Sequence, residues 1–118
     1  MGFFEKTISK EKIFSGKIID LNVHTVELPN GKTSKREIIN HAGGVAIIAY
    51  KDSETLFMVE QFRKPIEGTL LEIPAGKIEK NEDVLQCANR ELEEEIGYKA
   101  KELKYLGRIV TSPGFCDE

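Results

Sequence analysis

The chain has 118 residues and 40% hydrophobic content, enough for one globular core near the lower end of the usual domain size range. Charged residues make up 31% of it, but a formal net charge of -3 provides no basic field that would attract nucleic acid. The charged N-terminus, and the lack of any apolar run near the about 20 residues of a membrane span, predict a cytoplasmic protein that binds neither membrane nor nucleic acid.

Antiparallel strands are expected from about Lys12 to Asn40. An Asn-Gly turn at Asn30 and Gly31 separates two stretches that suit strands, which are residues 22–27 and 35–39. A strand-rich region of this size is too small to form its own core. We therefore interpret residues 1–40 as a β extension that could mediate homodimerisation, and residues 41–118 as the principal domain.

Three further strands are expected before a helix, and one after it. The apolar stretch Val45–Tyr50 is typical of a strand that is covered on both faces, so it should lie centrally in a sheet. The remaining strands are expected at residues 55–61, 70–73 and 103–110.

The helix is expected from Asn81 to about Glu95. Asn81 suits the N-cap, the acidic residues that follow it suit the positive end of the helix dipole, and Gly97 should end the helix. At helical spacing one narrow stripe is apolar and should be buried, and its members are Leu85, Ala88, Leu92 and Ile96.

Three carboxylates of this helix, those of Glu91, Glu94 and Glu95, are expected to converge on a different arc. Like charges at these spacings repel by roughly a few tenths of a kcal/mol per pair, so a counter-charge or a cation must offset them. Arg90 can brace Glu94 at i,i+4, which leaves Glu91 and Glu95 free to bind a hard divalent cation such as magnesium. A solvated acidic face is the alternative interpretation of a glutamate-rich helix.

The spacing of these residues favours the cation site. From Gly76 to Tyr98 the chain fills every fixed position of the pattern G-x5-E-x7-R-E-U-x-E-E-x-G-U, and a chance match has a probability on the order of 10⁻⁵. This pattern is the Nudix box, and the chain resembles the Nudix hydrolases. The resemblance implies an α+β fold, an α/β/α sandwich with a mixed β-sheet, and hydrolysis of the pyrophosphate in a nucleoside diphosphate that is linked to another group.

The resemblance also implies a catalytic set that consists of Arg90, Glu91, Glu94 and Glu95. Magnesium, with manganese as a possible substitute, would be held by the three glutamates and by the main-chain carbonyl of Ala75. Such a metal ion neutralises pyrophosphate oxygens and lowers the pKa of a bound water molecule.

The sequence around the box resembles the ADP-ribose pyrophosphatase branch of the family, from about Ile13 to Glu118. This likeness implies hydrolysis of ADP-ribose to AMP and ribose 5-phosphate. The segments that carry it are Leu28–Gly31, Lys35–Glu37, Gly44–Ala46, Gln61–Arg63, Glu72–Lys77 and Ser112–Phe115.

The same likeness implies a set of substrate-binding residues, which are Arg36, Glu37, Arg63, Ala75, Lys77 and Glu118. Arg63 would bind the phosphates, for which its fork of donors and permanent charge are suited. Arg36 would lie near the adenine, and Glu118 would accept hydrogen bonds from the terminal ribose hydroxyls. Two ordinary roles stay open, namely Arg63 as a surface arginine that ends a strand and Arg36 in a cross-strand ion pair.

The chain stops at Glu118, whereas Nudix domains usually continue with a strand, a loop and a closing helix. We therefore expect a domain that is incomplete at its C-terminus, with metal binding intact but turnover reduced. Two alternatives remain: a Nudix pyrophosphatase for another nucleoside diphosphate sugar, and a non-catalytic regulatory module that binds ADP-ribose. Both cysteines are interpreted as ordinary thiols and both histidines as structural, and no aromatic residue can be assigned to stack on adenine.

Overall fold

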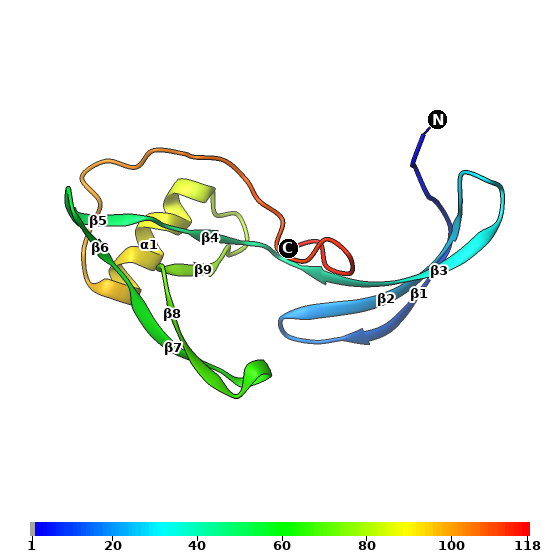
Figure 1. Ribbon diagram of the computed structural model, residues 1–118, viewed down its shortest axis with the longest axis horizontal. Helices are drawn as coiled ribbons and strands as arrows, with labels where there is room; N and C mark the ends of the chain where they lie inside the picture. Colours follow the sequence, from blue (N-terminus) through cyan, green and yellow to red (C-terminus); the bar gives the residue numbers. More distant parts are fainter. Residues whose placement is uncertain (1) are drawn as a thin grey trace. The chain divides into compact units, whose positions relative to one another are not determined.

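The computed structural model describes residues 2–118, which form mostly β structure with one α-helix (Figure 1). The strands are β1 (Lys6–Ser15), β2 (Ile19–Glu27), β3 (Thr33–His41), β4 (Gly44–Ala46), β5 (Ala49–Asp52), β6 (Thr55–Phe57), β7 (Val59–Arg63), β8 (Gly68–Glu72) and β9 (Ala75–Lys77). A 3-10 helix covers Lys64–Ile66, and the α-helix is α1 (Val84–Ile96). The chain forms two compact units. The first comprises the chain up to Gly43 together with Gly107–Glu118, and the second comprises Gly44–Leu106.

The first unit contains an antiparallel sheet in the order β1-β2-β3. The strands predicted between Lys12 and Asn40 are confirmed, although β1 begins earlier, at Lys6, and is exposed along its whole length. The Asn-Gly turn between β2 and β3 is also confirmed. Gly31 has a φ of 82°, which favours glycine, and its N–H donates to the Leu28 carbonyl at 2.9 Å.

The segment that leads to Glu118 contacts β3 within the first unit. Ile39 and Cys116 form an isolated parallel bridge, in which the Ile39 N–H donates to the Phe115 carbonyl at 2.7 Å and the Asp117 N–H donates to the Ile39 carbonyl at 3.1 Å. All pairs of named strands in residues 2–118 are antiparallel. These strands alone therefore do not form the mixed sheet that the family resemblance predicts.

Three antiparallel strand pairs make up the β structure of the second unit, namely β4 with β9, β5 with β6, and β7 with β8. The prediction of one continuous strand at Val45–Tyr50 is wrong, because β4 and β5 pair with different partners and the chain leaves the ladder between them, at Ile47 and Ile48. Ile47 is buried but Ile48 is 47% exposed, so this stretch is not covered on both faces.

Of the other predicted strands, one is confirmed, one is divided and one is wrong. The strand around residues 70–73 is confirmed as β8, whereas the stretch at 55–61 is divided at Met58 into β6 and β7. Residues 103–110 form no strand. Alternating apolar residues form a strand only where a ladder partner is available, and here Leu106 and Ile109 are 73% and 79% exposed.

The N-cap of helix α1 lies two residues after the expected one, and the helix ends where predicted. Asp83, not Asn81, is the N-cap, because its carboxylate accepts from the Gln86 N–H at 2.8 Å while the Gln86 side chain accepts from the Asp83 N–H at 3.3 Å. Asn81 instead has a positive φ of 63° in the preceding turn. Gly97 ends the helix with a φ of 74°, as predicted. No helix in residues 2–118 is long and apolar enough to cross a membrane.

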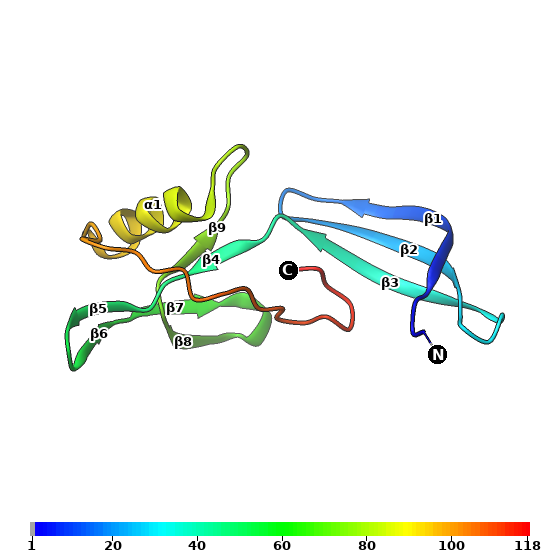
Figure 2. The same cartoon turned by 90° about the horizontal axis from the view of Figure 1, so that it is seen from above.

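The core of the second unit lies where α1 packs along β9 and β4 (Figures 1 and 2). Its buried centre consists of Ile47, Ala88 and Leu92, and Ile96 packs at its edge. Three of the four residues of the predicted apolar stripe are thus in or beside the core.

The fourth residue, Leu85, is 49% exposed, so its predicted burial is wrong. The buried arc of the helix instead includes Cys87 and Glu91. This difference reflects tertiary packing, because Glu91 occupies the space that Gly76 of β9 leaves by having no side chain.

Candidate active site

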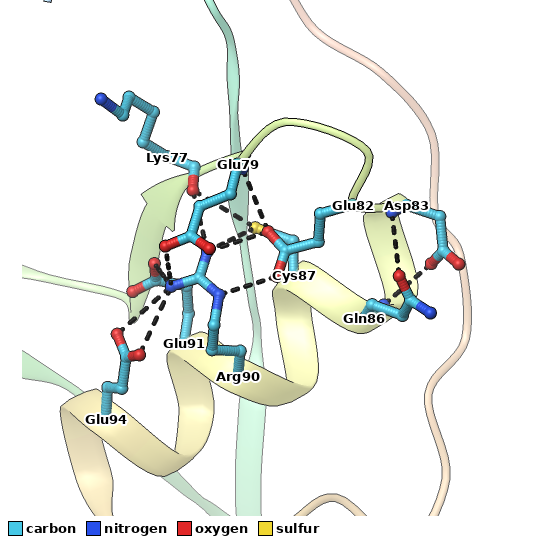
Figure 3. A network of polar contacts seen from close by, with 9 residues as sticks. All are labelled: Lys77, Glu79, Glu82, Asp83, Gln86, Cys87, Arg90, Glu91 and Glu94. Atoms are coloured by element: carbon cyan, nitrogen blue, oxygen red, sulfur yellow. Dashed lines mark hydrogen bonds and ion pairs between the residues drawn. The ribbon is translucent and has the colours of Figure 1, made fainter.

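Arg90, in the middle of α1, is surrounded by four carboxylates (Figure 3). Its Nε and Nη2 donate to the two oxygens of Glu82 at 2.7 and 2.9 Å. Its Nη1 donates to Glu91 at 2.7 Å and to Glu94 at 3.3 Å, and lies 3.7 Å from Glu79. The hydrogen bond with Glu82 above all, and then that with Glu91, raises the pKa of Arg90, so the guanidinium stays charged.

Arg90 also connects α1 to the end of β9 by a hydrogen bond. Its Nη2 donates to the main-chain carbonyl of Lys77 at 3.0 Å, and the Cys87 thiol contacts the same carbonyl at 3.6 Å. The Lys77 side chain extends away from the carboxylates (Figure 3). Lys77 therefore joins this network through its backbone oxygen.

Gly76 is required for the position of the Glu91 carboxylate. A Cβ at Gly76 would lie 1.8 Å from Cδ of Glu91 and 2.1 and 2.2 Å from its two oxygens. Glu91 is only 7% exposed, so the carboxylate is enclosed between α1 and Gly76 of β9. Glycine is needed at position 76 because it has no side chain, and not for its backbone freedom, since its φ is not positive.

The three glutamates predicted to converge do not form one cluster. Glu91 and Glu94 meet at Nη1 of Arg90, so the expectation that Glu91 is free of Arg90 is wrong. Glu95 is outside this network, and its charge instead contributes to raising the pKa of Arg63. Within residues 2–118, no three acidic, histidine or cysteine side chains are close enough together to hold a metal ion in this arrangement.

The chemistry of the network nevertheless fits a hard divalent cation. Its carboxylate and carbonyl acceptors supply the oxygen ligands that magnesium and manganese prefer. Four carboxylates face a single guanidinium, so negative charge is in excess. The Glu91 carboxylate already has a defined position, because it occupies the space left by the missing side chain of Gly76. The exposed side chain of Glu94 can turn without disturbing the core.

Arg63 is the last residue of β7 and is bound by the last residue of β8. Its Nε and Nη2 donate to the two carboxylate oxygens of Glu72 at 2.6 and 2.5 Å. This pairing raises the pKa of Arg63 and lowers that of Glu72. Within residues 2–118, Nη1 of Arg63 makes no hydrogen bond, so one edge of the guanidinium stays available to a ligand. The sequence analysis did not identify Glu72 as a partner of Arg63, because the two residues are not opposite each other in the hairpin, where Arg63 pairs with Gly68 and Glu72 pairs with Val59.

Arg36, Glu37 and Glu118 belong to the first unit. Arg36 donates from Nε and Nη2 to the two oxygens of Glu5 at 2.9 and 2.7 Å, an ion pair that the sequence analysis missed. The two residues are 31 positions apart, and no sequence signal connects them. Glu37 follows Arg36 on β3, where successive side chains alternate between faces, and it is exposed. Glu118 is exposed as well.

The family model for the NUDIX domain matches residues 40–117, which contain the whole box. The chain belongs to the Nudix family. A second model, described as the nucleoside diphosphate sugar hydrolase N-terminal domain, matches residues 5–39. The two matches meet beside the boundary that the sequence suggested at residue 40.

Two known proteins are similar to this chain over nearly its whole length. One is an ADP-ribose pyrophosphatase of Bacillus subtilis, 61% identical over 97% of this chain and 62% of the relative. The other is a methanol dehydrogenase activator of Bacillus methanolicus, 56% identical over 98% of this chain and 63% of the relative. The chain thus spans less than two thirds of either relative. A crystal structure of an ADP compounds hydrolase superposes with a TM-score of 0.84, 21% identity and coverage of 98% of this chain and 64% of that one, which shows the same fold.

The ion pair within the Nudix box predicts a stability loss at low pH. Hydrogen bonds from Arg90 are the main cause that lowers the pKa of Glu82 from 4.5 to about 2. Because the folded-state pKa is the lower one, this stabilisation is complete above pH 4.5 and is lost as the pH falls towards about 2. We expect the urea midpoint to fall across this window, and to fall less in Glu82→Gln. The control Glu60→Gln, at an exposed glutamate, should show the same fall in urea midpoint as the wild type. An equal fall in all three proteins would contradict the stabilising role of the ion pair between Glu82 and Arg90.

The two thiols should differ in reactivity. Cys87 is fully buried, and burial, followed by hydrogen bonding with Glu82, raises its pKa to about 11. Cys116 is partly exposed. Since the thiolate is the reactive form, an aromatic disulfide reagent at mildly alkaline pH should label Cys116 rapidly and Cys87 only after unfolding. Cys116→Ser should remove the rapid phase, and rapid labelling of Cys87 in the folded chain would disprove the burial.

Proposed function

We propose that the chain belongs to an enzyme that hydrolyses the pyrophosphate of ADP-ribose, giving AMP and ribose 5-phosphate, with magnesium or manganese as cofactor. The observation that carries this proposal is the enclosed Glu91 carboxylate beside Gly76, which meets the Glu94 carboxylate at Arg90. A negatively charged site with carboxylate oxygens suits a cation that binds a diphosphate. The 61% identity with an ADP-ribose pyrophosphatase supports the choice of substrate.

In this proposal Glu91, Glu94 and Glu95, with the main-chain carbonyl of Ala75, would hold the ion. When bound, the ion supplies positive charge to the pyrophosphate oxygens and a water molecule of lowered pKa. Arg90 orients the carboxylates, and it is oriented in turn by Glu82 and by the Lys77 carbonyl. Arg90 therefore acts on the ligands of the ion rather than on the substrate.

The substrate contacts are proposed from the free donors and exposed carboxylates. Nη1 of Arg63 would bind a phosphate oxygen while Glu72 holds the other edge of the guanidinium. Arg36, with Glu37 beside it, would bind near the adenine, and because Glu5 already occupies two donors of Arg36, substrate must share or replace that ion pair. Lys77 and Glu118 complete the proposed set, and Glu118 would contact the ribose hydroxyls.

Two alternatives each have one observation in their favour. The match of residues 5–39 to the N-terminal domain of nucleoside diphosphate sugar hydrolases favours another nucleoside diphosphate sugar as substrate. The relative that is named a methanol dehydrogenase activator favours a role in regulating a partner by a module that binds ADP-ribose.

We further propose the α/β/α sandwich of the family and a location in the cytoplasm. We also propose a homodimer formed through β1–β3, which light scattering would test.

A turnover assay separates these functions. The chain, and a longer version with further residues after Glu118, should release AMP from ADP-ribose in the presence of magnesium, the shorter one more slowly. Glu95→Gln should abolish product formation in both, whereas Glu93→Gln, an exposed glutamate on the same helix, should retain it. Binding of ADP-ribose without turnover in the longer chain would support the regulatory module. A panel of nucleoside diphosphate sugars, compared by kcat/KM, tests the substrate.

A further inference from the structure

The segment from Thr111 to Glu118 is a closed loop that is fixed to β3. The Cys116 N–H donates to the Ser112 carbonyl at 2.9 Å, and the Thr111 N–H donates to the main-chain oxygen of Glu118 at 3.3 Å. Two further main-chain hydrogen bonds connect this loop with Ile39, whose N–H donates to the Phe115 carbonyl and whose carbonyl accepts from the Asp117 N–H. The loop and the strand belong to the same compact unit.

Asp117 adds a side-chain attachment to these main-chain contacts. One carboxylate oxygen accepts from the Asn40 side-chain amide at 2.8 Å, and the other accepts from the His41 N–H at 2.7 Å. These two hydrogen bonds, that from Asn40 first, lower the pKa of Asp117, so the carboxylate is ionised and only accepts at neutral pH. Asp117 is therefore attached to β3 by both its backbone and its side chain.

The attachment extends to a buried asparagine on β2. Because Asp117 can only accept, Asn40 must turn its amino group towards it and its carbonyl oxygen towards Asn22. Asn22 accordingly donates its amino group to Asn40 at 2.9 Å. Asn22 is only 4% exposed, and its own carbonyl oxygen has no hydrogen-bond partner within residues 2–118. Asn22 thus orients Asn40 through its amino group.

We propose that Asp117 is a positioning residue for Glu118, supported by the hydrogen-bonded chain that runs from Asn22 through Asn40. Glu118 directly follows Asp117 and is exposed, so its placement depends on how firmly the loop is held. This inference rests on the proposed function, in which Glu118 contacts the terminal ribose of ADP-ribose. Fixing the loop before substrate arrives reduces the entropy lost on binding.

The hydrogen bond between Asn40 and Asp117 can be reversed by exchanging the two residues. In Asp117→Asn, the one remaining side-chain oxygen cannot accept from both the Asn40 amino group and the His41 N–H, so one of the two hydrogen bonds is lost while Asn40 keeps its orientation. In the double variant Asn40→Asp with Asp117→Asn, the new carboxylate accepts from residue 117 and can still accept from Asn22. The single variant should therefore release the loop and the double variant should restore it.

Equilibrium binding of two ligands tests the proposal. Asp117→Asn should weaken binding of ADP-ribose about tenfold, the loss expected for one good hydrogen bond. It should leave binding of ADP unchanged, because ADP lacks the terminal ribose. The double variant should recover most of the affinity for ADP-ribose. Amide hydrogen exchange at Ile39 and His41, which donate to the loop, should accelerate in the single variant and return to wild type in the double variant.

Three results would overturn the inference. They are unchanged ADP-ribose affinity in the single variant, equal weakening of ADP-ribose and ADP, and failure of the double variant to recover. Wild-type chain that binds ADP-ribose but does not hydrolyse it, even in the longer version, would refute the proposed reaction alone, since the positioning of Glu118 is judged by binding. Wild-type chain that binds no ADP-ribose would refute both.

Discussion

Replacing Gly76 by alanine is expected to remove most of the affinity of the chain for divalent cations and leave the chain folded. The added Cβ would occupy the position of the Glu91 carboxylate, so that carboxylate must leave its place between α1 and β9. The backbone of Gly76 has no positive φ, and alanine can adopt it without strain. Loss of a group that orients a metal ligand typically costs about tenfold to a hundredfold in metal affinity, and we expect a loss of this size.

Titration of the Gly76→Ala variant with manganese, followed by electron paramagnetic resonance, measures this loss, and circular dichroism checks the fold. Gly68→Ala is the matched control in the same unit, because its added Cβ would meet Ile66 at an ordinary contact distance of 3.6 Å. Equal manganese affinity in Gly76→Ala and the control would contradict the role of Glu91 as a ligand.

The features of this fold that the sequence predicts correctly are those encoded within a few residues. The turn at Gly31 and the helix end at Gly97 each need a positive φ, which glycine supplies, and both are as predicted. The helix start was also encoded locally, but Asn81 and Asp83 both suit an N-cap. The residue that decides between them is Gln86, because only Asp83 has a partner for a capping box three positions later.

The features that the sequence did not predict depend on contacts between distant residues. A continuous apolar stretch around Ile47 is divided because its two halves find different partner strands. Similarly, Leu85 is exposed because the helix turns Glu91 towards the space at Gly76. Periodicity identifies an apolar face but cannot identify the surface that the face meets.

The candidate site likewise combines features that local sequence predicts with contacts that it does not predict. The Nudix box predicts which residues gather at the helix, since their spacing is fixed by helical geometry. It does not predict that Glu91 bonds to Arg90, or that Glu95 lies outside their network, because these contacts depend on rotamers and on β9. The ion pairs of Arg36 with Glu5 and of Arg63 with Glu72 join residues that are not opposite each other in a strand pair, so they depend on side-chain contacts that no motif encodes.

Arg90 is the residue whose removal should destabilise the chain most. Arg90→Met deletes the only cation that the structure places among Glu79, Glu82, Glu91 and Glu94 within residues 2–118, and it also removes the hydrogen bond to the Lys77 carbonyl. We expect a large fall in the urea midpoint, whereas Arg108→Met, at an exposed arginine, should have little effect. The urea midpoint of Arg90→Lys should lie between those of the other two variants. An ammonium keeps the charge but lacks the fork of donors that binds both oxygens of Glu82.

A second substitution separates charge repulsion from lost packing. In the wild type, Glu82→Gln removes a partner of Arg90 and should lower the midpoint at neutral pH. In the Arg90→Met background the same substitution removes an uncompensated negative charge, so it should raise the midpoint. Added salt should likewise stabilise Arg90→Met more than the wild type, since it screens the repulsion of the two exposed carboxylates, those of Glu79 and Glu94. If Glu82→Gln lowers the midpoint in both backgrounds, Arg90 stabilises the helix by packing, and the carboxylates around it do not repel enough to require a cation.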